Sequence, residues 1–133
     1  MMRRSRSKPA SSARRFAEGS GRRAEALGAL FLQMKGYRIV GRRVKTPMGE
    51  IDLVARRGGV TAFVEVKARA FSSGEADAMM AVNRRRIVRA AQMWLSRNPA
   101  RSADILRFDV IFLAPFAWPR HIVNAFDDSG LNL

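Results

Sequence analysis

The side chains best suited to chemistry in this chain are two carboxylates and a lysine set around a Gly58-Gly59 pair. Asp52 precedes the glycines, and Glu65 and Lys67 follow them. Carboxylate oxygens bind divalent cations such as Mg²⁺, whose coordination shell is commonly completed by water and by phosphate groups of a substrate. These residue types predict a cation site if the fold brings the two carboxylates together.

A predicted β-hairpin does bring them together. The residues on either side of Gly58-Gly59 alternate between polar and apolar, as strands do, and Gly-Gly is a frequent hairpin turn. With the two glycines as the turn, counting outward puts Asp52 opposite Glu65 and Glu50 opposite Lys67. Because like charges at opposed positions repel each other, a divalent cation is the simplest reason for the Asp52–Glu65 pair.

The same alternation permits a second interpretation, in which the acidic residues lie on a solvated sheet face and Glu50 forms an ordinary ion pair with Lys67. Two features favour the cation site. Val54 and Phe63 share the charged face, so that face is not simply solvent, and two predicted helices have apolar stripes that can cover both sides of the sheet.

Composition excludes other kinds of site and indicates a polyanionic partner. The chain has 133 residues, no cysteine and one histidine, which excludes disulfides, thiolate sites and multi-histidine metal clusters. Lys+Arg 25 against Asp+Glu 11 gives a net charge of +14, which attracts DNA, RNA or an anionic membrane surface. No apolar run reaches the roughly 18–20 residues of a membrane span. We interpret the isolated His121 as a surface or core residue and not as a catalyst.

The chain divides into three predicted parts. Residues 1–20 form a basic arm that we expect to be disordered, although its Arg/Ser-rich composition also matches a transit peptide. Residues 21–126 form the folded domain, and residues 127–133 form a polar tail. We expect a cytoplasmic, nucleoid-associated protein without membrane association, since the arm lacks an amphipathic apolar face.

The folded domain is predicted to be α/β, with a central mixed sheet flanked by helices. Apolar residues recur at helical spacing in residues 21–36, including Leu27, Leu30 and Met34, and again in the second helix, at Ile87, Ala91, Trp94 and Leu95. The predicted order is αβββαβ with an extra C-terminal strand: helix 21–36, strands 37–45, 50–56 and 60–69, helix 75–98, and strands 107–113 and 120–126.

Two short segments resemble a known nuclease motif. Gly49 to Val54 reads GEIDLV and Phe63 to Lys67 reads FVEVK, which resembles the PD-(D/E)xK motif of an Asp, a turn and Glu-x-Lys. Glu50-Ile51 stands where the name of the motif has a proline.

The wider pattern resembles the YraN-like family of small bacterial proteins over about residues 21–126. Besides the two segments, the shared features are Glu25 in the first helix, Gly36-Tyr37, a basic helix and Arg107-Phe108-Asp109. Relatives often carry a lysine at the start of the basic helix, where this chain has Asn83-Arg84.

The resemblance implies a restriction-endonuclease-like core, similar to Holliday-junction resolvases, which act as dimers. If the motif residues have the same roles in this chain, Asp52 and Glu65 hold Mg²⁺ or Mn²⁺. Lys67 then orients the attacking water and stabilises developing negative charge. Glu25 reaches the site from the first helix, directly or through a water. The implied activity is metal-dependent hydrolysis of DNA by a homodimer, with branched or structured DNA as the implied substrate.

Four arginines crowd the start of the basic helix, where the helix dipole disfavours cations: Arg84, Arg85, Arg86 and Arg89. They form either a solvated face or, as we favour at this net charge, a patch that contacts DNA phosphates. A different class of function also fits the chain, a basic nucleic-acid-binding protein with an inactive nuclease fold. The complete set of Glu25, Asp52, Glu65 and Lys67 favours the nuclease.

Overall fold

The computed structural model describes residues 21–68 and 84–126. A helix at residues 21–34 comes first. It is followed by β1 (Arg38–Thr46), β2 (Gly49–Arg57), β3 (Val60–Ala68), helix α3 (Arg84–Arg97), the short 3₁₀ turn η1 (Pro99–Arg101), β4 (Ile105–Leu113) and β5 (Arg120–Phe126).

The predicted order of elements is confirmed, and β4 begins two residues earlier than expected. The predicted start of the second helix at Glu75 lies outside the described residues, as do the arm at 1–20 and the tail at 127–133. In the described part of the chain, no helix is long and apolar enough to cross a membrane.

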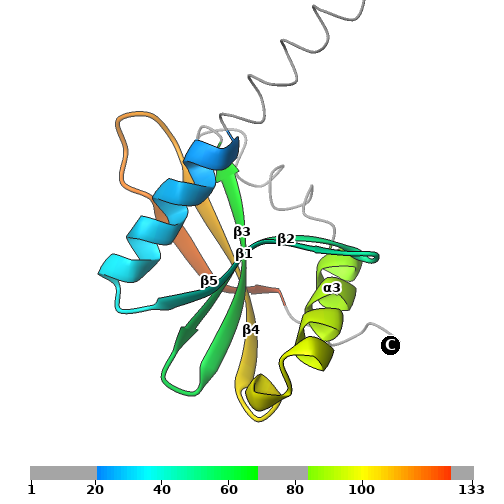
Figure 1. Ribbon diagram of the computed structural model, residues 1–133. Helices are drawn as coiled ribbons and strands as arrows, with labels where there is room; N and C mark the ends of the chain where they lie inside the picture. Colours follow the sequence, from blue (N-terminus) through cyan, green and yellow to red (C-terminus); the bar gives the residue numbers. More distant parts are fainter. Residues whose placement is uncertain (1–20, 69–83, 127–133) are drawn as a thin grey trace, which may run out of the picture.

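The described strands form one mixed sheet in the order β1-β2-β3-β4-β5 (Figure 1). The first three strands are antiparallel neighbours, β3 and β4 are parallel, and β5 returns antiparallel to β4. A parallel pair needs a crossover connection, and α3 lies in the connection between β3 and β4. This is the predicted α/β architecture, and it is consistent with a restriction-endonuclease-like core.

Two apolar clusters cover the sheet, one under each helix. Ile87, Ala91 and Trp94 of α3 are buried in one cluster with Val54 and Phe63, as their helical spacing predicts. The second cluster contains buried residues of helix 21–34 and of the strands: Ala29, Leu32, Leu53, Ala55, Ala62, Val64 and Ile111. Helix 21–34 packs closely on β3 because it carries glycine at position 28, where a Cβ atom would lie 3.0 Å from Val66 Cγ2.

The predicted hairpin register is confirmed from Arg57↔Val60 to Leu53↔Val64. Beyond Leu53 the pairing of β2 with β3 ends, while β2 stays paired with β1 as far as Gly49. The β1–β2 turn instead packs on the start of α3, where Arg86 Nε donates to the Met48 carbonyl at 3.4 Å (Figure 1). β2 therefore diverges from β3, and the two strands form a fork.

This divergence interrupts the alternation of side-chain faces along β2. By strict alternation Ile51 would lie on the face of Leu53 and Ala55, but Ile51 packs in the α3 cluster with Val54. A strand that bends at Asp52 changes the face that its tip presents, and period-two counting does not include such a bend.

A buried polar cluster joins β4 to β5 and explains the Arg107-Phe108-Asp109 segment. The Asp109 carboxylate accepts hydrogen bonds from Arg107 Nε at 2.9 Å, His121 Nε2 at 2.8 Å and the Asn124 N–H at 2.9 Å. Burial alone would raise the pKa of Asp109, but the bonds from His121 and Arg107 outweigh it and lower that pKa. Asn124 donates from a left-handed conformation, φ 57°, where the β4–β5 register shifts.

The His121 side chain is only 2% exposed, which agrees with the core position that was one of the two predicted for it. Lys35 Nζ lies 2.6 Å from His121 Nδ1. Because an ammonium group can only donate, Nδ1 is the acceptor and Nε2 carries the hydrogen given to Asp109.

Candidate metal and nucleic-acid site

The fork between β2 and β3 fixes the position of Asp52. Its Oδ2 accepts the backbone N–H of Val66 at 2.8 Å. Without β2 beside it, that N–H on β3 would lack a strand partner, and a buried unpaired donor is costly. The Asp52 carboxylate replaces the missing partner, so it is held at the point where the strands separate.

Three carboxylates from helix 21–34 and β2 converge beside the fork. Oxygen atoms of Glu25, Glu50 and Asp52 all lie within 4.8 Å of one another. The position of Glu50 differs from the predicted one opposite Lys67: its register partner is Lys45 on β1. The reason is the same divergence, which ends the β2–β3 ladder before Glu50.

Glu65 and Lys67 of β3 lie beside this group, although Glu65 is not among the carboxylates whose oxygens all lie within 4.8 Å of one another. The pKa of Glu65 is raised to about 8, first by burial and then by the negative charge of Asp52, while the positive charge of Lys67 partly offsets both. Lys67 Nζ lies 3.8 Å from Glu65 Oε2, and the Glu65 side chain is only 15% exposed. Asp52 and Glu65 are thus close enough to interact, although the β2–β3 ladder ends at Leu53↔Val64, one residue before they would pair.

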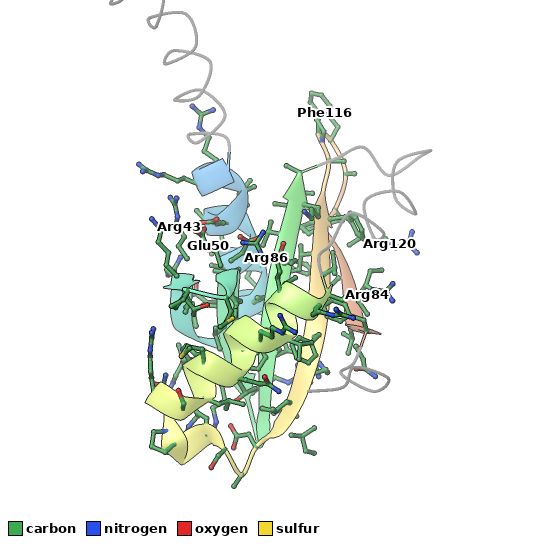
Figure 2. The ribbon with its side chains drawn as sticks, turned by 90° about the vertical axis from the view of Figure 1, so that its right-hand side faces the viewer. Arg43, Glu50, Arg84, Arg86, Phe116 and Arg120 are labelled. Carbon is green, nitrogen blue, oxygen red and sulfur yellow. The ribbon has the colours of Figure 1, made fainter. Side chains whose placement is uncertain are left out.

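Arg43 of β1 contributes a second cation that sequence reasoning did not single out. Its Nε lies 3.6 Å from Glu25 Oε1. Burial and the neighbouring Asp52 raise the pKa of Glu25, whereas Arg43 acts to lower it. Arg43 has a left-handed backbone, φ 47°, which is uncommon for a residue other than glycine. In Figure 2, Arg43 and Glu50 lie near each other at the edge of the sheet.

The donor set fits a hard divalent cation. All of its ligands are carboxylate oxygens, which Mg²⁺ and Mn²⁺ prefer. When ionised, Glu25, Glu50, Asp52 and Glu65 repel one another, because four negative charges lie close together. A divalent ion would offset this repulsion.

The four predicted arginines of α3 are all exposed. Arg86 lies nearest the acidic group, since it contacts the β1–β2 turn. At the other end of the patch, the Arg84 guanidinium lies 5.7 Å from the centre of the Phe126 ring. Figure 2 shows Arg86 close to Glu50 and Arg84 toward Arg120.

Comparisons with other proteins agree with the resemblance found in the sequence. The model of the uncharacterised protein family UPF0102 matches residues 24–113. A UPF0102 protein from Methylorubrum extorquens is 50% identical over 118 residues, which cover 89% of this chain and 92% of the relative. A UPF0102 protein from Rhodopseudomonas palustris is 50% identical over 122 residues, covering 92% of this chain and 94% of the relative. With the motif segments and the α/β fold in place, this chain belongs to the UPF0102, or YraN-like, family.

Proposed function

We propose that this protein is a metal-dependent endonuclease that hydrolyses phosphodiester bonds in DNA, with branched or structured DNA as the substrate class. The observation that supports the proposal is the convergence of Glu25, Glu50 and Asp52 at a strand fork beside Glu65 and Lys67. Without a cation, these carboxylates repel one another. They would also repel the polyanion that a chain of net charge +14 attracts.

Each residue of the group has a role in this proposal. A bound Mg²⁺ or Mn²⁺ supplies a coordinated water of lowered pKa and polarises the phosphate. Asp52 and Glu65 would hold the ion, and the Val66 N–H keeps the Asp52 carboxylate in place. Glu25 and Glu50 would supply further carboxylate oxygens to it. The Lys67 ammonium stabilises negative charge that develops on the phosphate.

The basic surface binds the DNA. Arg84, Arg85, Arg86 and Arg89 are exposed on the helix whose start packs against the β1–β2 turn, so phosphates bound there lie toward the acidic group. Such contacts position a duplex without reading its sequence. A DNA substrate places the protein in the cytoplasm, at the nucleoid.

A cleavage assay with an isosteric variant tests the proposal. Linear, flapped and four-way DNA are incubated with the parent protein and with Asp52→Asn, each with Mg²⁺, with Mn²⁺ and with EDTA. The asparagine carbonyl can still accept the Val66 N–H, so the variant should fold while losing a charged ligand. We expect cleavage by the parent with metal only, and none by Asp52→Asn. A parent protein that binds these DNAs but cuts none of them with either metal would favour the inactive, DNA-binding alternative.

The raised pKa of Glu65 predicts a pH-dependent response to metal. Between about pH 4.5 and pH 8 the folded protein keeps a proton on Glu65 that the unfolded chain releases. The free energy of unfolding of the metal-free protein should therefore fall as pH rises through this window, by up to about 1.4 kcal/mol per pH unit. Because a cation binds the deprotonated carboxylates, excess Mg²⁺ should raise the melting temperature more at about pH 8 than at about pH 5.

Calorimetry of the parent and of Glu65→Gln, with and without Mg²⁺, measures this effect. Glu65→Gln should show a shallower pH dependence and a smaller metal-induced increase in melting temperature. An increase that is the same at both pH values would contradict metal binding by these carboxylates.

A further inference from the structure

Helix 21–34 has two apolar faces, and the sheet covers only one of them. Its inner face is buried at Ala29 and Leu32, which are 1% and 0% exposed. Its outer face carries Leu27, Leu30 and Met34, which are 55%, 53% and 70% exposed. The spacing i, i+3, i+7 places these three side chains on one stripe. A helix that is apolar on both sides is typical of one that is covered on both sides.

The loop between β4 and β5 extends this apolar surface with two exposed aromatic residues. Phe116 is fully exposed and has a left-handed backbone, φ 59°, and Trp118 is 79% exposed. Figure 2 shows the Phe116 side chain pointing away from the rest of the protein. Between the loop and helix 21–34 lies an apolar groove of about 610 Å³. Among the described residues that line it, Arg23 is the one charged side chain.

We infer that this surface, made of the groove and its two aromatic residues, binds a second copy of the chain in a symmetric dimer. In a two-fold dimer the same patch forms both sides of the contact, so the patch must be complementary to itself. This surface meets that requirement, because it holds a groove lined in part by Trp118 and, next to it, the projecting Phe116 side chain that can enter the groove of the partner.

The available area is sufficient for a stable contact. An aromatic side chain buries about 150–250 Å², so Phe116 and Trp118 together supply roughly 300–500 Å² on each copy. Leu27, Leu30 and Met34, each more than half exposed, add to this area. A specific interface of standard size buries about 800 Å² on each partner, which this surface approaches with its five large side chains.

The charge distribution favours a second copy over DNA. A chain of net charge +14 repels its own copies, and the repulsion is least where two surfaces without charge meet. A phosphate backbone, in contrast, needs cations, and the groove offers Arg23 alone among its described lining residues. The dimer does not depend on the proposed nuclease activity, and its test involves no cleavage.

The test compares two substitutions that change charge and exposed apolar area alike. Met34 lies on the surface and is 70% exposed; Ile105, at the start of β4, is 69% exposed and outside it. Analytical ultracentrifugation of the parent, Met34→Glu and Ile105→Glu should give a dimer for the parent and for Ile105→Glu, and a monomer for Met34→Glu. Trp118→Ala should raise the dimer dissociation constant about thirty-fold, the effect of losing an aromatic hot spot. Added NaCl should strengthen the dimer, because it screens the repulsion.

Three results would overturn the inference. The first is a parent that is monomeric at every concentration while acrylamide still quenches Trp118, which would leave the surface uncovered. The second is a monomeric parent in which Trp118 is protected, which would assign the surface to a segment of the same chain. The third is a monomeric parent that binds vesicles of anionic lipid and loses this binding in Met34→Glu, which would assign the surface to a membrane.

Discussion

Lys67→Ala is expected to lower the rate of DNA cleavage by about 10²–10³ while the affinity for DNA stays nearly the same. Lys67 is one of 25 basic residues, so its loss changes the long-range field very little. Its proposed value lies in its position, with Nζ 3.8 Å from Glu65 beside the candidate metal ligands. Single-turnover cleavage and a binding titration, both at fixed ionic strength, measure the two effects separately.

A charge-matched control is Arg97→Ala. Arg97 follows Arg86 by eleven residues along α3, roughly 16 Å at the rise of an α-helix, so it removes one positive charge far from the fork. We expect parental cleavage from this variant. If Lys67→Ala cleaves as fast as Arg97→Ala, Lys67 has no part in the reaction. If both variants bind DNA poorly, the loss of cleavage in Lys67→Ala reflects the loss of a positive charge and not the position of that charge.

Asp109→Ala is expected to lower the free energy of unfolding by about 3–5 kcal/mol. The carboxylate is 1% exposed and accepts hydrogen bonds from Arg107, His121 and the Asn124 N–H. Its removal leaves the Arg107 charge without its main partner, and the buried His121 Nε2–H and the Asn124 N–H without this acceptor. This costs more than the loss of an exposed ion pair. Urea titration followed by circular dichroism measures the change.

Asp104→Ala is a comparison with fewer buried partners. Asp104 pairs with Arg56 at 2.8 Å, where the arginine side chain is 32% exposed, and it also accepts the buried Thr61 hydroxyl at 2.7 Å. A smaller loss of stability is expected there. Equal losses in the two variants would contradict a special contribution from the buried cluster. Asp109→Ala also tests the meaning of the Arg107-Phe108-Asp109 segment, which we assign to holding β5 against β4 and not to catalysis.

Most of the secondary structure and the central hairpin could be predicted from local patterns in the sequence. Period-two alternation and the Gly58-Gly59 turn depend on neighbours in the chain, and so do the helical stripes of residues 21–34 and α3. A two-residue turn also fixes the register of the strands next to it. The predicted and observed pairings therefore agree from Arg57↔Val60 to Leu53↔Val64. The same count placed Asp52 near Glu65, whereas Glu25 came from the family resemblance and Glu50 was predicted opposite Lys67.

The course of β2 beyond Leu53 depends on packing between segments that are distant in the sequence. The β1–β2 turn packs on α3, a contact between segments far apart in the sequence, and β2 bends toward it. That bend moved Ile51 to the α3 cluster and brought Glu50 to Glu25 and Asp52 instead of Lys67. No periodicity in one segment contains this information, because the bend depends on what the distant segment offers for packing.

The contact of Arg43 with Glu25 and the exposure of the outer face of helix 21–34 also depend on tertiary packing. The chain has 25 basic residues, and no local pattern marks the one that reaches Glu25 from a left-handed backbone. The helix has apolar residues on more than one side, and its sequence does not say which side meets the sheet. Packing of Ala29 and Leu32 on the strands decided that, and it left Leu27, Leu30 and Met34 exposed. Local patterns thus specified which elements form, whereas contacts between distant elements specified which side chains meet.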